Sequence, residues 1–285
     1  MRLARAHTRF GRVREALERL APEGGLPSLV VEALLFGFKQ GWACLFGALL
    51  LALLLATHLW YPATAPLARY DFLTLSALAI QIAMLLARLE TLDEAKVILA
   101  FHIVGTVMEL FKTAQGSWLY PEPAVLRLGG VPLFSGFMYA AVGSYIARIW
   151  RGFDFRFRRY PPRWATLLLA SAIYANFFSH HYLPDIRPAL FLGTLIVFGP
   201  TVVYFRPFRR HRPMPLVIGF LLVALFIWFA ENLGTFSHAW LYPGQRAGWA
   251  MVSPAKLGAW FLLMIISFVL VSLIHGIRRD CDQIR

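Results

Sequence analysis

The chain has 285 residues, of which 59% are hydrophobic and only 15% charged, with a mean hydropathy of +0.60 and a formal net charge of +13. A soluble domain carries about 25% charged residues, so this composition excludes an ordinary soluble fold. The apolar residues fall in blocks of roughly 18–25, which is long enough for helices that cross a bilayer.

The positive charge is concentrated first at the N-terminus, where the first twenty residues contain six Arg. Leu3, Phe10 and Leu17 are among apolar residues that recur there at helical spacing, which predicts a basic amphipathic helix (residues 1–27) on an anionic membrane surface. A mitochondrial presequence is the alternative, which Glu15 and Glu18 weaken. We therefore predict the lipid bilayer as the partner of these charges, and no nucleic acid.

Apolar runs predict an all-α polytopic membrane protein with about eight transmembrane helices, preceded by a short interfacial segment over 28–41. The helices are expected at about 42–60, 70–88, 96–113, 131–150, 164–181, 188–205, 214–235 and 255–276. If the N-terminus lies inside the cell, 22 of the 28 Lys and Arg fall on the cytoplasmic side. The positive-inside rule then predicts an inner-membrane protein with both termini in the cytoplasm.

One motif occurs twice, as ELFKTAQGSWLYP over 109–121 and ENLGTFSHAWLYP over 231–243. Both copies fit E-x3-T-x4-W-L-Y-P, with an offset of 122 residues that also aligns His58 with His180. We infer a duplicated four-helix unit, with repeats over 28–157 and 158–277 and a cytoplasmic tail over 278–285. Units of four helices enter the membrane from the same side, so their pseudo-twofold axis runs along the membrane normal.

This geometry predicts a functional site near the extracytoplasmic face. An intramembrane carboxylate is unfavourable unless it is protonated, paired or facing water, which makes each Glu a candidate. The candidate acid–base residues are Glu109, Glu231, His58 and His180, and the candidate substrate-binding residues are Trp118, Tyr120, Trp240, Tyr242, Asn176 and Asn232.

Structural alternatives exist for each candidate. Trp and Tyr are enriched at headgroup level in any membrane protein, and the Glu residues can form hydrogen bonds that only join the repeats. Lys112 stands three residues after Glu109 as a possible ion-pair partner, whereas Gly234 takes the equivalent place in the second copy.

We predict no cofactor and no metal site. Adjacent histidines such as His180 and His181 point about 100° apart on a helix, so they do not easily share one ion. Cys44 and Cys281 lie far apart in the chain, which predicts neither a disulfide nor a C-x-x-C zinc site.

Four segments carry a family resemblance: KQGWACLFG (39–47), VPLFSGFMYAAVGSY (131–145), YANFFSHHYLPDIR (174–187) and AENLGTFSHAWLYPGQ (230–245). The chain resembles the bacterial integral-membrane family called domain of unknown function 817, and the resemblance implies the fold and the membrane location. A fainter likeness links it to membrane carotenoid cyclases and hydratases, which also place an intramembrane Glu before an aromatic loop. The chain lacks their Pro-x-Glu-Glu and Thr-Gly-x-Pro-Phe-Gly patterns.

Two functions from different classes fit these observations. An intramembrane enzyme would act on an isoprenoid or another lipophilic small molecule, with one Glu as general acid and the other Glu or a His as base. A transporter or permease would use the same carboxylates as proton or cation sites between the repeats. The inner halves of the predicted helices contain few polar residues (Gln81, Ser76 and Thr201), which favours the enzyme. A non-catalytic membrane scaffold is the third possibility.

Overall fold

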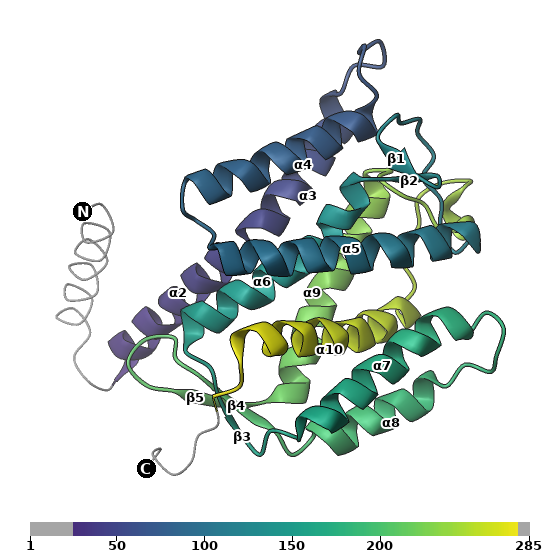
Figure 1. Cartoon of the computed structure of the whole chain (residues 1–285). Helices are drawn as coiled ribbons and strands as arrows, with labels where there is room; N and C mark the ends of the chain where they lie inside the picture. Colours follow the sequence, from purple (N-terminus) through teal and green to yellow (C-terminus); the bar gives the residue numbers. More distant parts are fainter. Residues whose placement is uncertain (1–24, 279–285) are drawn as a thin grey trace.

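Nine α-helices form most of residues 25–278, the part of the chain that the computed structural model describes (Figure 1). They are α2 (Leu26–Ala43), α3 (Leu45–Trp60), α4 (Arg69–Leu86), α5 (Leu92–Ala114), α6 (Phe134–Phe153), α7 (Arg163–Ser179), α8 (Arg187–Phe198), α9 (Leu216–Phe236) and α10 (Ala255–His275). The predicted amphipathic segment over 1–27 and the tail over 278–285 lie almost entirely outside the described residues.

The eight predicted helices correspond to α3 through α10, with two corrections. The segment expected at the interface over 28–41 is the regular helix α2, which meets α3 at a 64° bend. The helix expected over 188–205 ends at Phe198. Pro200 has no amide hydrogen to continue the helix, and the β-branched and aromatic residues that follow it form strand β4 (Val202–Phe205).

Two small antiparallel sheets depart from the all-helical prediction. Strands β1 (Arg127–Leu128) and β2 (Val131–Pro132) form a hairpin between α5 and α6. Strands β3 (Arg156–Arg158), β4 and β5 (Arg212–Pro215) form a three-stranded sheet in that order. The second sheet joins the segment after α6 to the connection between α8 and α9, so it ties the two predicted units together at their arginine-rich end.

The helices of the two predicted units pair in the same way. Helix α3 packs on α4 and α6, as α7 packs on α8 and α10, and α5 packs on α6 as α9 packs on α10. The pairs α3–α4 and α7–α8 lie on opposite sides of the other four helices (Figure 1). Between them, α6 contacts α10. The duplication remains a prediction, and this repeated pairing supports it.

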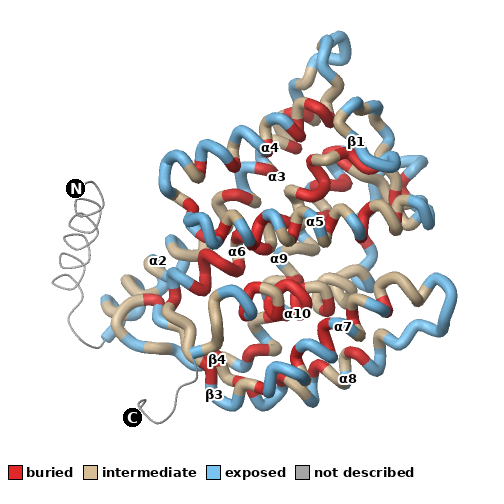
Figure 2. Tube along the Cα trace, viewed as in Figure 1, coloured by how far each residue is buried: buried red, intermediate tan, exposed pale blue. Residues whose placement is uncertain are grey.

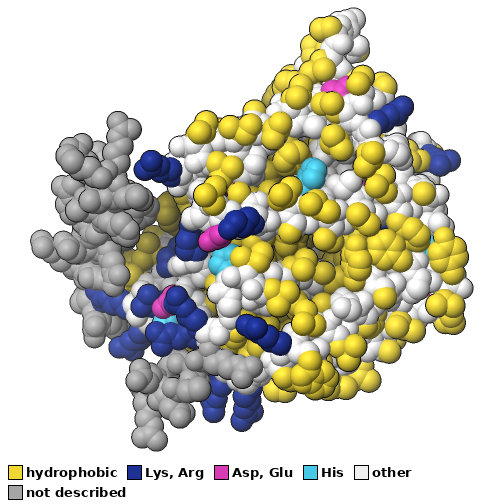
Figure 3. Space-filling view, in the orientation of Figure 1, with side chains coloured by type: hydrophobic (Ala, Val, Ile, Leu, Met, Phe, Trp, Pro, Cys, Tyr) yellow, Lys and Arg dark blue, Asp and Glu magenta, His cyan; other side chains and the backbone are white. Residues whose placement is uncertain are grey.

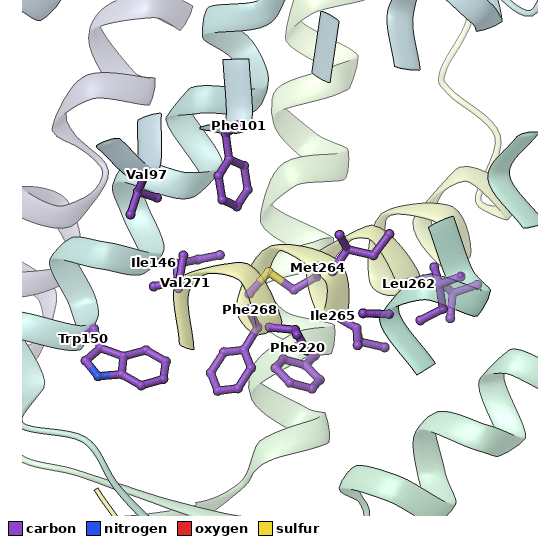
Figure 4. Packing of buried hydrophobic residues seen from close by; sticks show 14 of the residues in the cluster. Val97, Phe101, Ile146, Trp150, Phe220, Leu262, Met264, Ile265, Phe268 and Val271 are labelled. Carbon is purple, nitrogen blue, oxygen red and sulfur yellow. The ribbon is translucent and has the colours of Figure 1, made fainter. Parts of the chain in front are cut away.

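The core lies where α5, α6, α9 and α10 meet (Figure 4). Phe101 of α5, Trp150 of α6 and Phe220 of α9 pack in one cluster with Phe268 of α10, and the Trp150 and Phe268 ring centroids are 5.3 Å apart. Burying a large apolar side chain contributes roughly 1.5–3 kcal/mol in water, but lipid tails are themselves apolar. Close packing is therefore the main stabilising interaction between these helices.

The outward-facing turns of the helices are exposed (Figure 2), and many of the side chains on the visible surface are hydrophobic (Figure 3), as expected for a protein surrounded by lipid. On α4, Leu75, Leu78 and Ile82 form an exposed stripe at helical spacing. Among the described residues, α4, α5, α9 and α10 are each long and apolar enough to cross a membrane, and the bent α2–α3 pair brings the number to five. The chain is thus an integral membrane protein, while the eight crossings remain a prediction.

A buried ion pair lies away from the predicted site, near the loop between α4 and α5. The Arg148 guanidinium is 3.3 Å from a Glu90 carboxylate oxygen, and both side chains are 0% exposed. Ser144 also donates to Glu90 at 2.9 Å, and Gln81 donates to its second oxygen. The predicted helix ends at residue 150, whereas α6 continues to Phe153 and so contains both Arg148 and Arg151. The Arg151 guanidinium is 3.3 Å from Glu94 in the first turn of α5, so the two arginines hold α6 to the start of α5.

Candidate functional site

A cavity of about 760 Å³ lies between the two predicted units. Helices α3, α6, α7, α9 and α10 supply most of its wall, and the lining atoms are mostly carbon. Phe36, Gln40 and Cys44 bound one end, while Glu109 and Glu231 lie at the other. Along α6 the lining extends from Ser135 to Tyr145, which corresponds to about 15 Å of helix. The space is therefore long, mostly apolar and polar at one end.

Glu109 lies in the last two turns of α5, with three donors around its carboxylate. The Trp118 indole N–H and the Tyr120 hydroxyl donate to Oε2 at 2.7 and 2.6 Å. The Tyr139 hydroxyl of α6 donates to Oε1 at 2.8 Å. The positive-φ residue Gly116 allows the chain to reverse just after α5, which brings Trp118 and Tyr120 back toward the carboxylate.

Glu231 occupies the equivalent place in α9 but takes its donors from different positions. The Tyr242 hydroxyl donates to Oε1, and the Trp260 indole N–H of α10 donates to Oε2 at 2.6 Å. Both glutamates are 4% exposed. No ion pair with a Lys, Arg or His forms at either carboxylate within the described part of the chain. Within residues 25–278, the hydrogen-bond donors to the two acids are all neutral Trp and Tyr side chains.

The two carboxylates belong to one connected network. The rings of Trp118 and Tyr242 are 6.2 Å apart, and so are the rings of Tyr139 and Trp260. Each of these two ring pairs therefore has one member bonded to Glu109 and one bonded to Glu231. In addition, the N–H groups of Leu119 and Leu241 each donate to the other's carbonyl at 2.9 Å. This reciprocal pairing of equivalent residues is what a local twofold axis requires.

Lys112 points away from Glu109, contrary to the ion pair that the sequence suggested. Its ammonium is 2.8 Å from Nε2 of His181 and 3.2 Å from Nε2 of His180. Nδ1 of His180 lies 2.8 Å from the Asn176 carbonyl, so it carries the proton, and Nε2 accepts from Lys112. Because α7 ends at Ser179, both imidazoles reach one ammonium, which regular helical geometry would prevent.

The loop after α7 is fixed by a second set of polar contacts. The Asn176 side chain donates to Asp185 at 3.3 Å and accepts from the Ile186 N–H at 3.2 Å. Arg187 forms an ion pair of 2.5 Å with Asp185, which lowers the pKa of that carboxyl well below its usual range. Asp185 therefore stays ionised and neutralises Arg187.

Eight of the ten predicted site residues line the cavity. These are Glu109, Glu231, His180, Trp118, Tyr120, Trp240, Tyr242 and Asn176. The other two have different surroundings. His58 packs its ring against His238 and Phe236 at 5.2 and 5.6 Å. Asn232 accepts from the Val252 N–H at 2.9 Å and so fixes the loop before α10. The roles assigned to the ten residues remain predictions.

The cavity-lining residues that were not predicted as part of the site include Tyr139, Trp260, Lys112 and Lys256. Tyr139 and Trp260 come from α6 and α10, the fourth helix of each predicted unit. Their places differ by 121 residues, one less than the repeat offset, so a search at 122 misses them. The sequence feature that could have identified them is an aromatic side chain with a hydrogen-bond donor near the start of the fourth helix in each predicted unit.

These features define a class: a polytopic helical membrane protein with an apolar internal cavity that ends at two buried carboxylates. The DUF817 family, described as proteins of unknown function, matches residues 32–268, and the chain belongs to that family. The resemblance seen in the sequence is thereby confirmed. The uncharacterized protein YoaT of Bacillus subtilis (strain 168) is 42% identical over 245 residues, covering 86% of this chain and 92% of the relative.

The fold is also similar to a solved structure. The crystal structure of MvINS, a mycobacterial Insig homolog from Mycobacterium vanbaalenii, aligns with a TM-score of 0.50. The alignment covers 67% of this chain and 98% of that one, at 14% sequence identity. The likeness extends to the fold, which is that of a helical membrane protein.

Proposed function

We propose that this protein is an intramembrane enzyme that acts on an isoprenoid or another unsaturated lipid by acid–base chemistry. One observation carries the proposal: the long apolar cavity ends at Glu109 and Glu231, which the same aromatic network holds. A volume of about 760 Å³ is within the range of small-molecule sites, roughly 300–1,000 Å³. An apolar chain fills such a space without leaving polar groups unpaired.

The chemistry follows from two carboxyl groups that act on one alkene. A protonated carboxyl group donates its proton to one alkene carbon, and a cation develops on the other. The second carboxylate then removes a proton from a neighbouring carbon, so the double bond migrates and no atom is gained or lost. Aromatic rings that line the cavity near the carboxylates can stabilise the cationic intermediate. The partner carboxylate serves better as base than His180, because Nε2 of His180 already accepts from Lys112.

The position of the cavity between two similar units favours a second candidate, a transporter. Carboxylates at a repeat interface bind protons or cations in such proteins. Against this, the cavity wall toward the arginine-rich end is formed by apolar residues such as Leu50, Phe226 and Leu262, with Gln40 as a polar exception. A polar solute would have to cross that wall, whereas a lipid tail would be stabilised by it.

The orientation that we propose places the site near the extracytoplasmic face of a bacterial inner membrane. The visible Lys and Arg side chains gather mainly around the β3–β4–β5 sheet (Figure 3). The positive-inside rule assigns that end to the cytoplasm. Glu109 and Glu231 both lie near the C-terminal ends of their helices, α5 and α9. In this orientation those helix ends are in the outer half of the membrane.

Proton transfer to carbon can be tested even while the lipid is unidentified. The protein is expressed, incubated in D2O in mild detergent, and its retained lipids are analysed by mass spectrometry. An acid–base enzyme should place deuterium on carbon in a discrete lipid retained by the wild type. The Glu109→Gln/Glu231→Gln double variant should retain the lipid without the label, because Gln preserves the shape but has no acidic proton.

The matched control is Asp93→Asn, which removes an exposed carboxylate far from the cavity and should label as the wild type does. If wild type and double variant carry the same label, or if both retain only bulk phospholipid, the acid–base proposal is wrong. Solute uptake into vesicles that depends on the two Glu residues would then favour the transporter.

A further inference from the structure

A group of basic side chains lies at the carboxylate end of the cavity and is not used by the proposed reaction. Lys112, Lys256 and Arg187 all line the cavity there, together with His180. They come from four separate places in the fold: the end of α5, the start of α10, the start of α8 and the end of α7. The convergence of basic groups from distant segments on one space indicates a site for an anion.

The two lysines supply positive charge that no direct ion pair neutralises, whereas Asp185 neutralises Arg187. Among residues 25–278, neither Lys112 nor Lys256 lies within ion-pair distance of a carboxylate. Lys112 is only 4% exposed, and a buried ammonium without a counter-ion is costly. A negatively charged ligand would remove that cost.

Among the residues that the structure describes, both ammonium groups have neutral neighbours and no anionic partner: the Lys112 ammonium lies within 3.2 Å of the His180 and His181 imidazoles, and aromatic rings lie beside both lysines. Lys112 is 4.3 Å from the Phe177 ring centroid, and Lys256 is 4.2 Å from that of Tyr242. Cation–π contacts of this kind are weaker than a charge-assisted hydrogen bond in a dry site.

We infer that the ligand of the cavity is an anionic amphiphile, a phosphate-bearing isoprenoid, whose phosphate binds between Lys112 and Lys256 while its chain fills the apolar space. A lysine ammonium is a strong point-charge partner for phosphate. The proposed reaction starts with one of the two carboxyl groups protonated, so the two lysine ammonium groups outnumber the single carboxylate charge near them. The inference deepens the proposed function by naming the head group of its substrate, and it rests on the same cavity.

The test is a binding comparison between three probes by equilibrium dialysis of the full chain in detergent: farnesyl monophosphate, farnesol and inorganic phosphate. Wild type should bind farnesyl monophosphate about tenfold or more tightly than farnesol, the ratio that one charge-assisted hydrogen bond provides. The Lys112→Gln/Lys256→Gln variant should bind both within about twofold of each other. Lys96→Gln, which changes an exposed lysine on the outside of α5, should retain the preference.

The outcomes separate the possible errors. Equal binding of farnesyl monophosphate and farnesol by wild type, or a preference that persists in the double variant, would overturn the head-group assignment. Inorganic phosphate that displaces farnesyl monophosphate at equal concentration would assign the site to free phosphate. If Lys112→Gln/Lys256→Gln does not fold, Lys112→Arg/Lys256→Arg should fold and keep the preference, and its loss there would also contradict the assignment.

Failure of the head-group assignment is distinguishable from failure of the proposed function. If farnesol binds without a phosphate preference while retained lipid still takes up deuterium at carbon, only the head-group assignment fails. If neither isoprenoid binds and no lipid is labelled, both fail together.

Discussion

In the first copy of the repeated motif the Trp118 indole donates to Glu109, whereas in the second copy the equivalent Trp240 forms no such bond and lies against Gly234. Glu231 takes its indole donor from Trp260 of α10 instead. Glu109 thus has three donors and Glu231 has two. The same thirteen-residue pattern produces two different carboxylate environments.

The position that differs is the one three residues after each Glu. A Cβ atom built on Gly234 would lie 2.1 Å from Cη2 of Trp240, so only glycine lets this indole cross the helix. Lys112 occupies the equivalent place in α5, and its side chain runs toward His180 and His181. Because the first copy has no glycine at this place, Trp118 does not cross the helix as Trp240 does, and its indole lies against Glu109 instead. The difference between Lys112 and Gly234 is therefore associated with both the extra cation and the third donor.

Removal of the carboxylates should expose this difference most strongly. Glu109→Ala leaves three donors without an acceptor and Glu231→Ala leaves two, and each buried unpaired donor costs about 1–3 kcal/mol. We expect both variants to unfold at lower temperature in detergent than wild type, with Glu109→Ala the less stable. Glu109→Gln and Glu231→Gln, which keep an acceptor oxygen, are the matched controls and should differ little. Equal losses for the two Ala variants would contradict the asymmetry.

The sequence was informative where a property is local. Continuous apolar runs predicted eight of the nine described helices, and most of α2 was predicted as an interfacial segment over 28–41. The repeat identified Glu109 and Glu231 and the aromatic loops that follow them. These features depend on residues close together in the chain.

The rest depends on contacts between distant segments. The β3–β4 pairing joins residues more than forty positions apart, and the Glu90–Arg148 ion pair joins residues 58 positions apart. Helical spacing made Lys112 a possible ion-pair partner of Glu109. Its actual partners come from the end of α7, which no spacing rule on α5 includes. Tertiary packing, and not helix periodicity, decides which side chains meet at the site.

Gly234→Ala tests whether the position after Glu231 determines the course of Trp240. The added methyl group cannot fit beside the rigid indole, so Trp240 must move, and overpacking of this kind costs about 1–3 kcal/mol. We expect a lower thermal midpoint and a shift in tryptophan fluorescence. Gly41→Ala, in α2 with open space around its Cβ position, is the control and should unfold at the wild-type temperature or slightly above. A Gly234→Ala protein with wild-type stability would show that Trp240 is not confined.

The smallest expected changes in stability come from two Tyr→Phe variants. Comparing them tests whether a tyrosine beside Glu109 affects the reaction more than a tyrosine at the other end of the cavity does. Tyr139→Phe removes one donor to Glu109 but keeps the ring beside Trp260, and Tyr145→Phe removes a hydroxyl that donates to Gln40 at 2.9 Å near the other end of the cavity. Each change should cost about 1 kcal/mol, since one hydrogen bond is lost in each case. Deuterium incorporation into the retained lipid should slow in Tyr139→Phe and remain at the wild-type rate in Tyr145→Phe. If both variants lose stability equally and label at the same rate, the donors around Glu109 serve only to hold the helices together. The Tyr139 hydroxyl at the reacting end would then influence proton transfer no more than the Tyr145 hydroxyl, which lies about 9 Å away along the helix.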